Sequence, residues 1–61
     1  MSDKDVKPLK QQSKIFREMA DLLDKAVIAI ENGEDDKVEE ILGVYLIKIL
    51  QLKAIEVKEL N

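Results

Sequence analysis

The 61-residue chain contains no cysteine, histidine or tryptophan. Without cysteine it forms neither a disulfide nor a thiolate nucleophile, and without histidine it lacks the usual general base and the commonest transition-metal ligand. No glycine-rich phosphate loop is present, and Ser2 and Ser13 have no neighbouring base to activate them. The sequence therefore predicts a protein that is not an enzyme, has no cofactor or metal site, and takes no small-molecule substrate.

Long apolar runs are also missing. The most apolar stretch, residues 41–55, is interrupted by Lys48, Gln51 and Lys53, so it falls short of the roughly 20 residues that a membrane span needs. The first ten residues, MSDKDVKPLK, have no apolar core and do not form a secretory signal. We expect a cytoplasmic protein that does not enter the membrane. Its few aromatics and its Lys-, Glu- and Ile-rich composition are typical of thermophilic proteins.

The first half of the chain predicts an amphipathic helix from about residue 5 to residue 32, after a frayed tail at residues 1–4. Pro8 fits the first turn of a helix, where amides lack partners and the Asp5 carboxylate can cap them. The apolar positions form an arc of roughly 160°, against the roughly 100° that a core-facing helix needs. We expect this arc to face the core; it contains Leu9, Ile15, Phe16, Met19, Ala20, Leu22, Leu23, Ala26, Val27, Ala29 and Ile30.

A turn at residues 33–35 and a second helix from about residue 36 to residue 60 follow. Gly33 can adopt the left-handed conformation that closes a helix, and Asp36 with Glu39 resembles a capping box. The second helix is apolar around most of its circumference, since its main polar strip covers only about 80°. Gly43, which is unfavourable inside a helix, predicts a close helix crossing.

Two helices of similar length joined by a short turn predict an all-α fold, an antiparallel two-helix hairpin in which residues 5–61 form a single domain. One neighbouring helix cannot cover the second helix. We therefore expect the hairpin either to pair into a four-helix bundle as a homodimer or to dock on a larger protein, and the sequence does not choose between these partners.

The function that the sequence favours is that of a non-catalytic protein–protein interaction module or accessory subunit, acting through an aliphatic helix–helix interface. A membrane-surface role is disfavoured, because few basic residues flank the apolar face and tryptophan is absent. The predicted contact centre is the most apolar part of the second helix and consists of Leu42, Tyr45, Leu46, Ile49, Leu50 and Leu52.

An alternative is a small nucleic-acid-associated regulator. Basic residues share one exposed face of the first helix and could contact phosphates; they are Lys7, Lys10, Lys14 and Arg17. A paired hairpin with such a strip is similar in architecture to the small plasmid RNA-binding hairpins of the Rop type, a resemblance of architecture without a shared sequence motif. Nucleic acid is not favoured, because Glu18, Asp21 and Asp24 continue the same face and the net charge is −3.

The acidic turn is the densest run of charge in the chain. Its carboxylates could attract a basic partner or a hard cation, or they could be a solvated turn that favours the start of the second helix. Gly33 precedes the acids rather than following them, which does not match a calcium-binding loop. We expect the solvated turn; its acids are Glu31, Glu34, Asp35, Asp36, Glu39 and Glu40.

Overall fold

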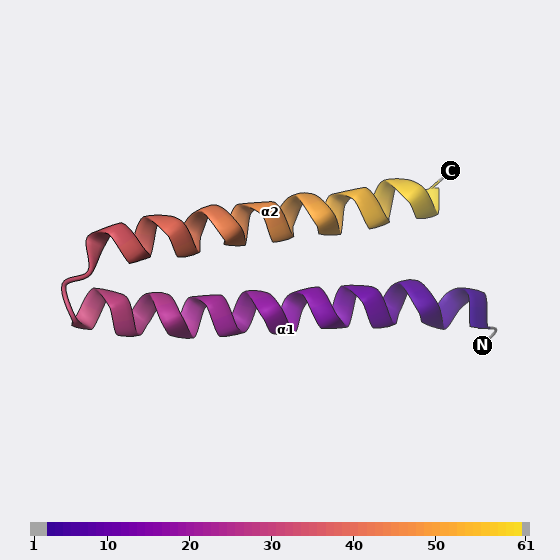
Figure 1. Cartoon of the computed structure of the whole chain (residues 1–61). Coiled ribbons are helices and arrows are strands. Elements are labelled where there is room, and N and C mark those ends of the chain that lie inside the picture. Colours follow the sequence, from indigo (N-terminus) through magenta and orange to yellow (C-terminus); the bar gives the residue numbers. More distant parts are fainter. Residues whose placement is uncertain (1–2, 61) are drawn as a thin grey trace.

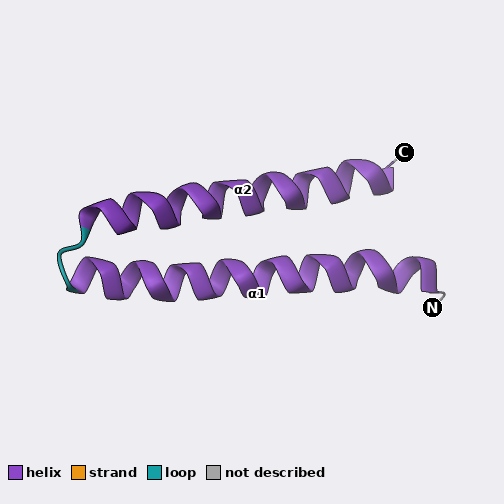
Figure 2. Ribbon diagram, in the orientation of Figure 1, coloured by secondary structure: helices purple, strands orange, loops and turns teal. Residues whose placement is uncertain are grey.

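The computed structural model describes the backbone of residues 3–60 and the side chains of residues 6–56. Two helices, α1 (Asp3–Glu31) and α2 (Asp35–Leu60), run antiparallel and contact each other (Figure 1). The start of α1 and the end of α2 lie at the same end, here called the open end, and a short loop joins the helices at the other end (Figure 2). The predicted all-α antiparallel hairpin is confirmed.

The start of α1 differs from the sequence prediction. The helix begins at Asp3, which makes Pro8 its sixth residue and places the proline beyond the first turn. Proline inside a helix removes one N–H donor, here the donor for the carbonyl of residue 4. Only this one hydrogen bond near the helix end is lost, so the helix continues in both directions from Pro8.

The turn closes α1 with a Schellman motif centred on Gly33. The Glu34 N–H donates to the carbonyl of Ala29 at 2.9 Å, and the Gly33 N–H donates to the carbonyl of Ile30 at 3.1 Å. This double closure requires a left-handed residue, and Gly33 has a φ of +69°. The carbonyl of Glu34 then accepts the first hydrogen bond of α2, from the N–H of Val38 at 3.2 Å. Gly33 thereby ends one helix and permits the reversal, as its position after Asn32 predicted.

The two helices meet along one row of side chains on each, which we call the inner seam. Members of a row are separated alternately by three and four residues, the spacing that keeps side chains on one side of a coiled-coil helix. On α1 the row is Pro8, Gln12, Ile15, Met19, Leu22, Ala26 and Ala29, all buried or half-buried. Along α2 the row begins at Glu34, just before the helix, and consists of half-buried residues only: Glu34, Val38, Ile41, Tyr45, Lys48, Leu52 and Ile55.

The hairpin is a single layer. Its Cα atoms extend over 47 × 19 × 8 Å, so the molecule is one helix thick. Domains bury their apolar faces between at least two layers, and this hairpin has only the one line of contact between its helices. Among the described side chains none is less than 2 % exposed, and the buried apolar ones are Ile15, Met19, Ala26 and Ala29.

The structure bears on two expectations about packing inside the hairpin. The wide apolar arc of α1 does not pack on α2 as a whole: Ile15 and Met19 are buried, whereas Phe16 and Leu23 are exposed. One straight helix can touch only a narrow stripe of another, so the remainder of a wide arc stays outside. Gly43 does not mark a helix crossing inside the hairpin, because a Cβ added there would meet nothing within 4 Å.

Candidate protein interface

A second row on each helix carries large apolar side chains that the hairpin leaves exposed. On both helices this outer row follows the inner seam by one residue, so it keeps the spacing of three and four. On α1 it contains Leu9, Ser13, Phe16, Ala20, Leu23, Val27 and Ile30. On α2 its apolar members are Leu42, Leu46 and the half-buried Ile49, and its polar members are Asp35, Glu39, Lys53 and Glu56.

Both outer rows lie on the same side of the hairpin. One residue advances a helix by about 100°, clockwise along α1 and anticlockwise along the oppositely directed α2 when both are viewed from the open end. The two inner rows point toward each other, that is, in opposite directions. Turning about 100° clockwise from one and about 100° anticlockwise from the other therefore leads to the same side of the hairpin. The outer rows of α1 and α2 therefore form one continuous surface, here called the outer face.

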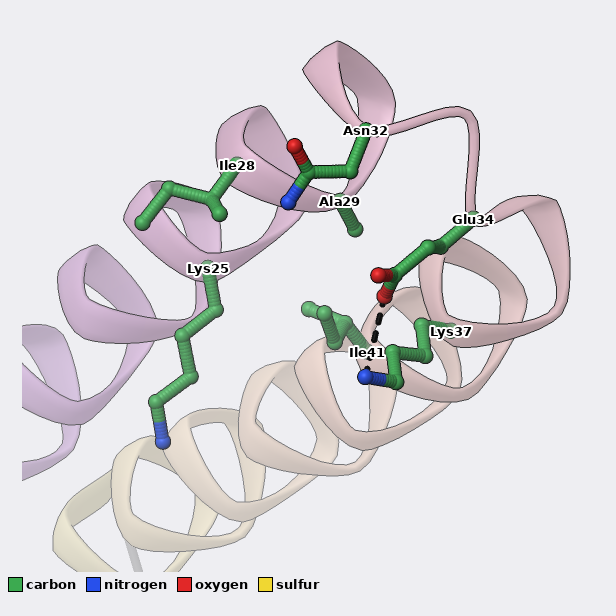
Figure 3. Close-up of a pocket in the computed structure, with 7 residues that line it drawn as sticks. All are labelled: Lys25, Ile28, Ala29, Asn32, Glu34, Lys37 and Ile41. Atoms are coloured by element: carbon green, nitrogen blue, oxygen red, sulfur yellow. Dashed lines mark ion pairs between the residues drawn. The ribbon is translucent and has the colours of Figure 1, made fainter.

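Two cavities on the side of the hairpin opposite the outer face agree with this geometry. Residues one position before the inner seam should share the opposite side, here called the charged side. One cavity, of about 300 Å³ near the turn, is lined from both helices, by Lys25 and Ile28 of α1 and by Lys37 of α2 among others (Figure 3). A second is lined by Glu18, Asp21, Leu22, Lys25, Val44 and Lys48. The side opposite the outer face is thus shallow and largely charged.

The exposure of the outer face is large in absolute terms. Phe16 is 56 % exposed, Ile30 63 % and Leu46 60 %. A compact monomer of 7.0 kDa is expected to expose about 4,000 Å², whereas this chain exposes 5108 Å². The excess, roughly 1,100 Å², is comparable to the roughly 800 Å² that each partner buries in a standard protein interface. The exposed aliphatic residues of the hairpin thus suggest an interaction surface.

One ion pair is built into the inner seam. The Lys48 Nζ donates to Glu18 Oε2 at 3.2 Å, and the Lys48 side chain is only 20 % exposed. Lys48 occupies a position on α2 where its neighbours in the row are aliphatic or aromatic. Its stem is covered while its ammonium reaches the carboxylate at the edge of the charged side. A charge at this place favours the register in which Glu18 and Lys48 lie level with each other.

A second ion pair lies in the turn. Lys37 Nζ is 2.9 Å from Glu34 Oε2, one turn earlier (Figure 3). The Glu34 carboxylate raises the pKa of Lys37, first by accepting its hydrogen bond and then by attracting its charge. The pair is open to solvent, so it contributes little to the stability of the hairpin.

Charge is divided unequally along the length of the hairpin. The turn half, residues 21–46, carries eight carboxylates and two lysines, whereas the rest of the chain carries eight basic residues and five acids. The outer row of α2 follows the same division, because Asp35 and Glu39 precede its apolar centre and Lys53 follows it. The hairpin therefore has an acidic turn end and a basic open end.

The structure distributes the six predicted contact residues over three places. Leu42, Leu46 and the half-buried Ile49 belong to the outer face. Tyr45 and Leu52 belong to the inner seam, where they pack toward α1. The sixth, Leu50, is 66 % exposed on the side of α2 that faces away from α1, at the border of the outer face.

The predicted basic strip is exposed, and so is the acidic turn apart from the half-buried Glu34. The side chains of Lys7, Lys10, Lys14 and Arg17 all reach solvent away from the outer face. Asp21 and Asp24 are exposed on the following turns of α1, so the basic strip ends within the open half. In the acidic turn, no three carboxylates among the described residues converge as ligands for a metal ion.

Sequence reasoning missed the contribution of α1 to the exposed surface, because its whole apolar arc was expected to face a single core. A signal was present in the arc itself. An arc of roughly 160° holds two adjacent rows of three-and-four spacing, and each row suits one neighbouring helix. The missed residues are Leu9, Phe16, Leu23, Val27 and Ile30.

Comparison of the chain with protein-family models, with curated proteins and with solved structures gives no match in any of the three. Over the described residues, neither helix combines the length and the apolar character that would let it cross a bilayer. The outer face is therefore the feature of this protein that indicates a function.

Proposed function

We propose that this protein is a non-catalytic protein–protein interaction module whose outer face is covered by other helices. The observation that carries the proposal is the row of exposed apolar residues on α1 beside the exposed Leu42 and Leu46 of α2, on a hairpin with only one line of internal contact. Contiguous apolar surface of this size on a small soluble chain is characteristic of interaction sites. The charged side is poorly suited to the same role, because its exposed aliphatic residues are interrupted by lysines and carboxylates.

The partner that the outer face fits best is a second copy of the hairpin. Each copy presents a mainly apolar row on α1 beside a row on α2 whose centre is apolar, both with coiled-coil spacing. Two outer faces placed against each other therefore form a four-helix bundle. Small residues in the row of α1, Ser13 and Ala20, alternate with large ones such as Phe16 and Leu23, which allows side chains to interdigitate. The excess exposed area is also what one copy buries in a standard dimer.

A nucleic-acid role is less well supported than self-association. Lys7, Lys10, Lys14 and Arg17 remain accessible in a bundle formed through the outer face, but the strip is short and acidic side chains follow it. No aromatic side chain of the charged side is available for stacking on bases, among residues 6–56.

The first test replaces neighbouring exposed aliphatic residues that lie on opposite sides of α2. Leu46 belongs to the outer face, whereas Ile47 belongs to the charged side and is 52 % exposed. We expect Leu46→Asp to dissociate the dimer, because a carboxylate would be buried without a partner. Sedimentation equilibrium of both variants and the parent chain measures the change.

Ile47→Asp is the matched control and should leave the dimer intact, because its side chain remains in water. A monomeric parent chain that melts cooperatively would refute the proposal. So would an Leu46→Asp variant that stays dimeric.

A further inference from the structure

The hairpin has two symmetric ways to cover its outer face with a second copy, and they differ in the direction of the partner. In one, the two-fold axis runs along the bundle and both turns lie at the same end. In the other, the axis crosses the bundle and the turn of each copy lies beside the open end of the other. Both leave every helix antiparallel to its neighbours, so helix packing alone does not select between them.

We propose that the copies pair turn to open end, about an axis that crosses α2 near Leu46 and α1 near Ala20. This inference rests on the proposed self-association and specifies its geometry. Pairing turn to turn would place two acidic halves together, each with eight carboxylates and only two lysines. Pairing turn to open end places each acidic half beside a basic half, and like-charge repulsion is replaced by attraction.

The outer row of α2 supplies a specific pair for this arrangement. Glu39, Leu46 and Lys53 follow one another at intervals of seven residues, so they lie along one line of the helix. A two-fold axis near Leu46 places a residue before Leu46 in one copy opposite the residue that lies equally far after Leu46 in the second copy. Lys53 of one copy then lies opposite Glu39 of the second copy, twice in the dimer. In the turn-to-turn arrangement neither residue faces the other.

The small side chain of Ala20, which lies at the proposed axis on α1, is consistent with this geometry. The levels of the two helices are related by the Lys48–Glu18 contact, which places Leu46 level with Ala20. Equivalent residues of the two copies meet at a two-fold axis, where a small residue on α1 lets the helices approach closely. Ala20 is exposed in the hairpin and would be covered in the dimer.

The direction of the second copy is measured with single spin labels. The chain has no cysteine, so Asn32→Cys near the turn and Gln11→Cys near the open end each provide one thiol per chain. Both residues are exposed and lie away from the outer face. Double electron–electron resonance on each labelled dimer, and on a one-to-one mixture of the two, gives the distances between copies.

The proposed arrangement separates the two Asn32→Cys labels by about 35 Å along the bundle and the two Gln11→Cys labels by about 27 Å, at about 1.5 Å per residue from the axis. The mixed dimer should add a distance shorter than both of these, between labels on different variants, because residue 32 of one copy is then nearly level with residue 11 of the other. A short distance between two Asn32→Cys labels would overturn the orientation while leaving self-association standing. A monomeric parent chain would overturn both.

Charge reversal gives an independent readout. Lys53→Glu and Glu39→Lys should each raise the dimer Kd about tenfold, since each turns two attractions into two repulsions. The double variant should return to within about threefold of the parent. Lys10→Glu makes the same change of net charge in the open half but away from the outer face, and should alter the Kd less than threefold. Failure of the double variant to recover would refute the pairing.

Discussion

The inner seam and the outer face are adjacent rows of the same two helices, and on α1 the exposed row carries more large apolar side chains than the buried row. On α1 the inner seam contains Gln12 and two alanines near the turn, while the outer row one residue later contains leucine, phenylalanine, valine and isoleucine. On α2 the inner seam includes Lys48, paired with Glu18. On α1, most of the side chains with much to gain from burial are therefore ones that the single hairpin exposes.

The difference indicates which contact provides most of the stability. Burial stabilises in proportion to the apolar area removed from water, about 25 cal/mol per Å². Alanines in the seam of α1, such as Ala29 at 4 % exposure, let the helices approach but contribute little apolar area. Larger residues on the outer face contribute only when that face is covered. The inner seam sets the register and direction of the hairpin, and the outer face is expected to supply most of the free energy of folding.

The largest expected effect is on the outer face itself. Phe16→Ala should lower the free energy of unfolding by about 3 kcal/mol per chain, because the ring is covered in the dimer. In an isolated hairpin the same ring stays largely in water, and the loss would be within about 0.5 kcal/mol. Urea denaturation at a fixed protein concentration measures the difference, since the stability of a dimer depends on concentration.

The matched variant for this comparison is Met19→Ala, which shortens a buried side chain of the inner seam. It should cost about 2 kcal/mol whether or not the second copy is present. If Met19→Ala were severely destabilising while Phe16→Ala had no effect, the inner seam would be the main source of stability and the comparison would be reversed.

An intermediate effect is expected at Lys48. Replacing it with methionine keeps the apolar stem and removes a half-buried charge, which should raise the free energy of unfolding by about 1 kcal/mol. Glu18 stays accessible to water and tolerates the loss of its partner, since its side chain is 41 % exposed. Thermal unfolding of the variant, at the parent's concentration, checks the sign. A lower stability would mean that the ion pair contributes more than the apolar contacts replacing it.

The smallest effect is expected at Gly43, which belongs to neither the inner seam nor the outer face. Gly43→Ala should stabilise the protein by about 0.5 to 1 kcal/mol, because alanine restricts the unfolded chain and favours the helix. Open space surrounds the added methyl group. A destabilised variant, measured by the same urea titration, would instead show that a helix of the second copy approaches α2 at this residue.

Much of the fold could be predicted from local patterns. The period of the apolar residues indicated two helices, and the Asn32-Gly33 pair indicated the left-handed closure that ends α1. The predicted helix start placed Pro8 in the first turn, whereas α1 begins at Asp3 and Pro8 lies in the second turn. The helix tolerates proline there because only one hydrogen bond is lost, and no sequence pattern indicates that tolerance. Local propensity determines which segments are helical, but it does not state how far each helix extends.

The candidate site could be predicted only in part from the sequence. Exposure of Leu46 and Leu50 follows from an α2 that is apolar around most of its circumference. The roles of Tyr45 and Phe16 do not follow, since both are aromatic residues within apolar arcs, and one belongs to the inner seam while the other is exposed. The choice depends on the rotation of each helix about its own axis.

By itself, the sequence determined that this chain forms two amphipathic helices, reverses direction at Gly33, and carries more apolar surface than a hairpin can bury. Only the tertiary structure decided which of two adjacent rows becomes the seam and which remains available. The physical reason is that both rows have the spacing a neighbouring helix requires. Their assignment depends on side-chain size and on the Glu18–Lys48 contact between residues distant in sequence.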